Sequence, residues 1–109
     1  MGRPNLRLRR EVRKLFSSGV IYHGRWMHVR SGESLFPNVM ISIRKRFGGA
    51  VLRNKARRRI RAICRDILPN GSHGQLLLIS IADGASRTCF NDLRNDLTSA
   101  FSHLGLLDQ

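Results

Sequence analysis

The sequence predicts an α/β fold of the α+β type, a two-layer sandwich in which helices pack on a four-stranded sheet. Three segments place apolar residues at helical spacing, and four short runs rich in β-branched residues lie between them. The resulting element order is αβββαβα. With 109 residues, 41% of them hydrophobic, the chain is expected to form one domain, residues 1–109, with a core of its own.

The first predicted helix covers residues 5–18. Its apolar face consists of residues spaced i, i+4, i+7 and i+8, namely Leu8, Val12, Leu15 and Phe16. Asn5 is the expected cap at the start, and Gly19 is the expected stop. Phe16 has two open interpretations at this point, because it shares a face with core residues and can also serve as a ligand contact.

Four runs are expected to be strands: 20–23, 25–30, 38–43 and 75–81. In the second run, alternation puts Met27 and Val29 on one face. The opposite face then carries Trp26, His28 and Arg30. The last run, QLLLISI, is apolar almost throughout, which is typical of a central strand covered on both sides. Loops are expected at 31–37 and 70–74.

The second and third predicted helices cover residues 50–68 and 88–104. The second has an apolar stripe about 120° wide, formed by Leu52, Ala56, Ile60, Ile63, Cys64 and Ile67. Pro69 and Gly71 are expected to end it. The third repeats apolar residues at helical spacing up to Gly105, namely Phe90, Leu93, Leu97, Phe101 and Leu104.

Positive charge is concentrated in one part of the chain. The formal net charge is +13, and residues 44–65 hold ten basic residues and no acidic one. Arg53, Arg57 and Arg61 are spaced i, i+4, i+8, and each such like-charge pair costs a few tenths of a kcal/mol. A merely solvated helix normally mixes charges of both signs. The pattern therefore predicts a polyanionic ligand, with nucleic acid favoured over a membrane surface.

Several function classes are disfavoured. No apolar run approaches the ~20 residues of a membrane-spanning helix, and the basic start lacks the apolar run of a secretory signal. Cys64 and Cys89 lack metal-site or redox spacing, so we expect free, buried thiols and a cytoplasmic location. The seven acids are scattered, without a pairing suited to acid–base catalysis or to a metal. No catalytic residue and no metal site are therefore expected in the protein.

The stretch RKRFGGAVLRNKARRRIR, residues 44–61, resembles the arginine-rich signature of the protein subunit of bacterial ribonuclease P. In that signature a basic stretch and a glycine-containing turn precede an Arg-Asn-basic triplet, here Arg53, Asn54 and Lys55, that opens a basic helix. The segment LRLRREVRKLFSSG resembles the family's first helix, and the element order matches over the whole chain. Val12 departs from the family, which often has an aromatic residue there.

The resemblance implies the fold, the function and the partners. The fold would contain an unusual left-handed βαβ crossover. The protein would bind the catalytic RNA of ribonuclease P and the 5′ leader of precursor tRNA, and so support removal of the leader. The RNA would carry out the chemistry with Mg²⁺, without a cofactor held by the protein. A monomer within a 1:1 protein–RNA complex is implied.

The resemblance also implies two sets of site residues. The expected contacts to the catalytic RNA are Arg44, Lys45, Arg46, Arg53, Asn54, Lys55, Arg57, Arg58, Arg61 and Arg65. The expected cleft for the leader is lined by Val12, Phe16, Trp26, His28 and Arg30. Asn54 has a structural alternative, in which its side chain bonds to neighbouring backbone groups or to a loop. Two other functions stay open, a structural RNA-binding module of ribosomal type and a DNA binder that reads the major groove.

Overall fold

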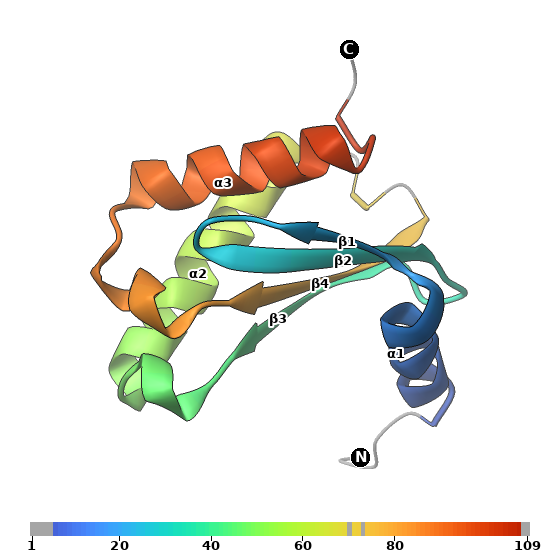
Figure 1. The fold of residues 1–109 in the computed structure, drawn as a ribbon, viewed down its shortest axis with the longest axis horizontal. Coiled ribbons are helices and arrows are strands. Elements are labelled where there is room, and N and C mark those ends of the chain that lie inside the picture. The colour runs from blue at the N-terminus through green and yellow to red at the C-terminus, as the bar shows by residue number, and fades with distance from the viewer. Residues whose placement is uncertain (1–5, 70, 73, 108–109) are drawn as a thin grey trace.

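The computed structural model describes residues 6–69, 71–72 and 74–107 (Figure 1). Its helices and strands are α1 (Leu6–Ser18), β1 (Val20–His23), β2 (Met27–Glu33), β3 (Asn38–Ile43), α2 (Ala50–Ile67), β4 (Gln75–Ile81) and α3 (Phe90–His103). Two short 3₁₀ helices, η1 (Lys45–Phe47) and η2 (Asp83–Arg87), follow β3 and β4. The predicted order αβββαβα is confirmed. The cap predicted at Asn5 lies outside the described residues.

The four strands form one mixed sheet in the order β1-β2-β4-β3. The β1–β2 and β2–β4 pairs are antiparallel, and β3 runs parallel to β4. β4 is a central strand, as its apolar sequence predicts, and five of its seven residues are buried. β1 and β3 are the edges of the sheet.

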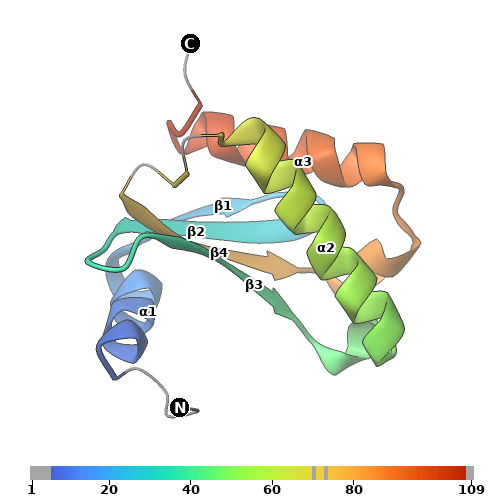
Figure 2. The same ribbon diagram turned by 180° about the vertical axis from the view of Figure 1, so that it is seen from behind.

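The β3–α2–β4 connection is left-handed. In Figure 1 both strands point left, β4 lies above β3, and α2 returns behind the sheet; Figure 2 shows the same helix in front. Such connections are right-handed in nearly all folds. The crossover implied by the family resemblance is thereby confirmed.

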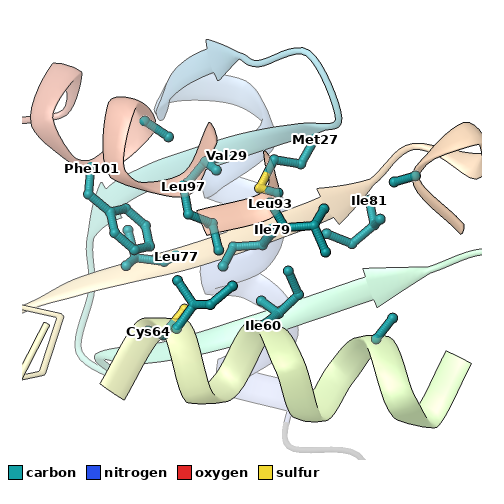
Figure 3. Close-up of a cluster of buried hydrophobic side chains, with 14 of the residues drawn as sticks. Met27, Val29, Ile60, Cys64, Leu77, Ile79, Ile81, Leu93, Leu97 and Phe101 are labelled. Atoms are coloured by element: carbon teal, nitrogen blue, oxygen red, sulfur yellow. The ribbon is translucent and has the colours of Figure 1, made fainter. Parts of the chain in front are cut away.

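The main core lies between the sheet and the pair of helices α2 and α3 (Figure 3). Met27 and Val29 face this layer, as strand alternation predicts. The apolar stripe of α2 meets them through residues that are almost fully covered, namely Ala56, Ile60, Ile63 and Cys64. α3 contributes its own buried stripe of Leu93, Leu97, Ala100 and Phe101. Each fully buried large side chain contributes about 1.5–3 kcal/mol.

α1 packs on the opposite face of the sheet, apart from the other two helices (Figures 1 and 2). Leu15 is buried against Leu76 and Leu78 of β4, with Val12 and Met40 half-buried beside them. The two-layer description therefore holds for the sheet with α2 and α3, and α1 adds a small second core. One helix cannot cover a four-stranded sheet, so part of this face stays open.

Two predicted elements have wrong boundaries. β2 begins at Met27 instead of 25 and continues to Glu33, into the predicted loop 31–37. Its last three residues pair with β4, and this long-range pairing outweighs the weak strand propensity of Ser-Gly-Glu. α3 begins at Phe90 instead of 88, because Cys89 has the extended backbone of a helix cap.

The turn between β1 and β2 is held by α3. One carboxylate oxygen of Asp96, Oδ1, accepts a hydrogen bond from the backbone N–H of Arg25 (3.2 Å), and Oδ2 accepts one from that of Trp26 (2.7 Å). Gly24 is required for this approach, since a Cβ there would lie 2.5 Å from Asp96 Oδ1. The end of the β1–β2 hairpin is thus fixed by a residue about 70 positions away.

Candidate nucleic-acid interface

The arginine face of α2 is the side of the helix that its apolar stripe leaves free. The members of the predicted RNA-binding set on this helix are exposed or half-exposed, namely Arg53, Asn54, Lys55, Arg57, Arg58, Arg61 and Arg65. Within the described part of the chain, none of these basic side chains forms an ion pair with a carboxylate. The ladder of like charges is therefore left without compensation in the free protein, as a surface built for phosphates would be.

Asn54 positions one of these arginines. Its side-chain carbonyl oxygen accepts a hydrogen bond of 3.4 Å from Nη1 of Arg57, one turn along. The alternative in which Asn54 bonds to backbone groups is not what the structure contains. Arg53 lies beside the apolar stripe, and its Nε is buried without a hydrogen-bond partner among the described residues. Arg53 therefore has a donor that is unused in the free protein.

The approach to α2 contains the remaining predicted contacts. Lys45 and Arg46 are exposed on η1, which Phe47 anchors in the core. Arg44 forms an ion pair of 2.7 Å with Asp83 of η2, which holds the ends of the two parallel strands together. Gly48 has φ of 154°, a conformation that side chains rarely adopt, and it turns the chain into the helix. Arg44 is thus already engaged, unlike its two neighbours.

The open sheet face is the part of the sheet that α1 leaves uncovered. We define it by the side chains that share this face by strand register, namely Arg30, His28, Ser80 and Ser42. Phe16 of α1 borders it with 52% of its surface exposed. The guanidinium carbon of Arg30 lies 4.4 Å from the centroid of the Phe16 ring. Phe16 is therefore a surface residue and not a core residue.

The other predicted cleft residues are placed differently. Val12 lies between α1 and the sheet, half-buried beside Leu15. Trp26 was expected beside His28 and Arg30, and this placement is wrong. Trp26 precedes β2 in the Asp96-bound turn, so strand alternation does not govern it, and it packs against the core on the α3 side. It borders a small cavity there together with α3 residues.

His23 is a residue of this face that the sequence reasoning missed. It lies directly opposite His28 across the hairpin, and the two Nδ1 atoms are 3.0 Å apart. The rings meet edge to face with centroids 4.8 Å apart. Residues 23 and 28 flank the turn symmetrically, but the turn residues carry no strong signal that would have fixed this register in advance.

The arginine face of α2 and the open sheet face meet at the edge strand β3. Arg61 and Arg65 line a cavity of about 180 Å³ with Val39 of β3. The opposite flank of α2 faces α3, where Asp66 pairs with Arg94. The other side of β3 carries Ser42 of the open sheet face. A nucleic acid on the arginines of α2 can therefore continue around this edge.

Metal and thiol chemistry find little support in the described part of the chain. No three His, Cys, Asp or Glu side chains there are grouped so that they could hold a metal ion. Both cysteines are free, as predicted, but only Cys64 is buried. The burial predicted for Cys89 is wrong, because this residue caps the start of α3 at the surface. Burial raises the pKa of the Cys64 thiol to about 11, although the nearby Arg61 opposes this shift, so the thiol is unreactive at neutral pH. No described helix is long and apolar enough to span a membrane.

The fold and its basic face define an α+β nucleic-acid-binding domain. Residues 3–105 match the family model described as Ribonuclease P, so the chain belongs to the ribonuclease P protein family. The ribonuclease P protein component of Pseudanabaena sp. (strain PCC 6903) is 24% identical over 106 residues, which cover 94% of this chain and 91% of that protein.

Solved structures agree on the fold. The ribonuclease P protein of Thermotoga maritima, in complex with 1-(4-fluorophenyl)-2-thiourea, is 25% identical with a TM-score of 0.70, over 87% of this chain and 94% of that one. A Staphylococcus aureus ribonuclease P protein mutant with defective mRNA degradation activity has a TM-score of 0.76 at 20% identity. That match covers 91% of this chain and 86% of the other. The chain is thus a protein subunit of ribonuclease P, a tRNA-processing ribonucleoprotein, and family membership implies ribonuclease P RNA as its partner.

Proposed function

We propose that the chain binds ribonuclease P RNA through the arginine face of α2 and holds the 5′ leader of precursor tRNA on the open sheet face. The protein would then support removal of the leader as one subunit of the enzyme. Its positive charge reduces the repulsion between two RNAs, and contacts to the leader distinguish precursor from mature tRNA. A 1:1 complex with a monomeric protein follows from the family resemblance.

The observation that carries the proposal is the exposed Phe16 ring beside Arg30. Leaders vary in sequence, so their recognition has to tolerate any base. Aromatic rings and guanidinium planes accept every base by stacking, at about 1–3 kcal/mol per base. Phe16 lies at the border of the open sheet face, and β3 connects that face with the arginines of α2.

The proposed chemistry belongs to the RNA and its Mg²⁺. Four of the acidic residues have structural bonds instead of free carboxylates. Asp66 and Asp83 are in ion pairs, and Asp96 holds the hairpin turn. Glu11 accepts hydrogen bonds from the backbone N–H of Leu35 and from a serine hydroxyl. This supports a protein that positions RNA and supplies none of these carboxylates to the cleavage step. Free thiols support the proposed cytoplasmic location.

Leader-dependent binding tests the proposal. Precursor tRNAs with leaders of zero to eight nucleotides are titrated with ribonuclease P RNA, with and without the protein, and equilibrium affinities are measured. The protein should strengthen binding of the longer-leader substrates by an order of magnitude more than binding of mature tRNA. If it strengthens both equally, the leader contact is wrong. Competition by ribosomal RNA or duplex DNA at equal strength would favour one of the other two functions.

A further inference from the structure

The His23–His28 pair is a polar cluster on the open sheet face that the proposed function has not used. Gly24 donates its backbone N–H to the carbonyl oxygen of Met27 at 2.8 Å, so residues 24 and 27 form the hydrogen-bonded pair of the hairpin. The next pair outward, His23 and His28, is therefore a non-hydrogen-bonded pair, in which side chains are closest. The Asp96 bonds to the turn keep this geometry fixed.

The bond between the two Nδ1 atoms determines how the pair carries protons. One Nδ1 must donate and the other must accept, because they lie 3.0 Å apart. In the neutral pair, the donating ring has no proton on its Nε2. Adding one proton there leaves the Nδ1 bond intact and gives both rings an outward Nε2–H. A second proton would destroy the shared bond. With one added proton, the pair therefore presents two outward N–H donors and one positive charge.

The side chains that share this surface with the pair are basic or uncharged. Arg30 faces the same side from β2, and Arg9 and Arg13 lie on the exposed flank of α1 that also carries Phe16. The hydroxyls of Ser80 and Ser42 continue the row on β4 and β3.

The nearby acids are already engaged. The carboxylate of Asp83, beyond the ends of β3 and β4, is paired with Arg44. Asp96 and the side chain of Arg25 lie at the turn on the side of Trp26 and α3. No carboxylate of the described residues bonds to either imidazole. A phosphodiester would supply the missing negative charge.

We propose that the His23–His28 pair is a further contact for the leader, a two-donor site for one phosphodiester group that takes up one proton from solvent when the leader binds. The proposal rests on the proposed function. His28 is two residues from Arg30 along β2, about 7 Å away, a spacing comparable to that of neighbouring phosphates in an extended strand. Phe16 and Arg30 would hold one nucleotide, and the imidazole pair would hold the next phosphate.

Proton uptake gives the proposal a signature that simple packing lacks. If the complex binds one more proton than the free components, lowering the pH strengthens binding by at most tenfold per pH unit. Histidine changes its charge between about pH 5 and 8. The leader's contribution to affinity should therefore increase several-fold from pH 8 to pH 6. Affinity for mature tRNA should not show this dependence on pH.

The test compares precursor and mature tRNA binding to the reconstituted RNA–protein complex at pH 6, 7 and 8. The ratio of the two affinities removes effects that are common to both substrates. The wild-type ratio should rise several-fold as the pH falls, and the double variant His23→Gln/His28→Gln should give a flat ratio. His103→Gln, the same change on α3 beside Tyr22, should keep the wild-type dependence. A double variant that keeps this dependence overturns the proposal.

A second measurement is independent of the folding of any variant. Imidazole resonances of the wild-type protein are followed by NMR at pH 7 as a leader oligonucleotide is added to the RNA–protein complex. One proton should be gained at the pair, and unchanged protonation would contradict the proposal. If precursor and mature tRNA bind equally at every pH, the proposed function is wrong, and so is the contact between the histidine pair and the leader. A pH-independent leader advantage overturns the contact alone.

Discussion

The guanidinium of Arg30 lies over the ring of Phe16, 4.4 Å from its centroid, and joins α1 to β2 across an otherwise open surface. Both groups have flat faces that stack on nucleic-acid bases. Their contact orients the two side chains before any ligand arrives, so less rotamer freedom is lost on binding. This relationship suits the open sheet face to the proposed leader contact and leads to the first prediction.

Replacing Phe16 with alanine should weaken binding of a leader-bearing precursor by about 5- to 150-fold, since one stacked base is worth about 1–3 kcal/mol. Affinity for mature tRNA should hardly change. Because the side chain is half-exposed, unfolding free energy should fall by much less than in the control Leu15→Ala, where about 2–5 kcal/mol is expected for a buried leucine. Equilibrium titrations give the affinities, and denaturant unfolding gives the unfolding free energies. Equal weakening for both tRNAs would assign Phe16 to general RNA binding.

Replacing Arg61 with glutamine should change binding and stability in opposite directions. Losing one phosphate contact should reduce the slope of log affinity against log salt by about 0.7–0.9. Removing a like charge from between Arg57 and Arg65 should raise the unfolding free energy by a few tenths of a kcal/mol. Arg59→Gln is the matched control, because Arg59 lies two helical turns before Asp66, which pairs with Arg94 of α3. If both variants have the same slope of log affinity against log salt, the arginine face of α2 is not the surface that contacts phosphate.

Replacing Asp96 with alanine should lower the unfolding free energy by about 2 kcal/mol, because two backbone N–H groups of the hairpin turn lose a charged acceptor. Asp92→Ala, one turn earlier and exposed, should cost no more than about 1 kcal/mol through the helix dipole. Urea unfolding of both proteins makes the comparison. Equal losses would mean that the carboxylate does not hold the turn.

The buried Cys64 thiol should make stability depend on pH in alkaline solution. Its pKa rises from an ordinary value of 9.0 to about 11 on folding, because burial disfavours the thiolate. Between pH 9 and 11 the unfolded chain loses this proton while the folded chain keeps it. Stability is therefore fully present below pH 9 and is lost as the pH rises, by about 2 kcal/mol at pH 11.

Cys64→Ala provides the control for that prediction. The unfolding free energy of this variant should not decrease for this reason as the pH rises. The difference in unfolding free energy between wild type and variant should therefore shrink from pH 9 to pH 11. Cys89 is exposed and should react with iodoacetamide at pH 8 in the folded protein, whereas Cys64 should not. A constant gap together with rapid labelling of Cys64 would show that the thiol is accessible.

Local pattern was sufficient for the features that depend on a single element. The stripe of α2 and the apolar run of β4 specify their own structure, because periodicity reports directly which sides are buried. The arginine face followed from the same helical spacing. The left-handed crossover had to come from the family resemblance, since general rules predict the opposite hand.

Features that depend on distant residues could not be predicted from local pattern. Trp26 turns toward α3 because Asp96, some 70 residues away, binds its backbone. Phe16 was ambiguous because its exposure depends on how much of the sheet α1 covers. The His23–His28 pair depends on the register of a hairpin whose turn residues, Gly24 to Trp26, carry no strong turn signal.

Reconstitution of the enzyme measures the proposed function itself. The purified protein is mixed with a bacterial ribonuclease P RNA and a precursor tRNA at moderate salt and low Mg²⁺, and release of the 5′ leader is followed over time. We expect cleavage at the mature 5′ end that is strongly stimulated by the protein, requires the RNA, and is absent with protein alone. Cleavage by the protein without RNA, or no stimulation of an RNA known to be active, would contradict it.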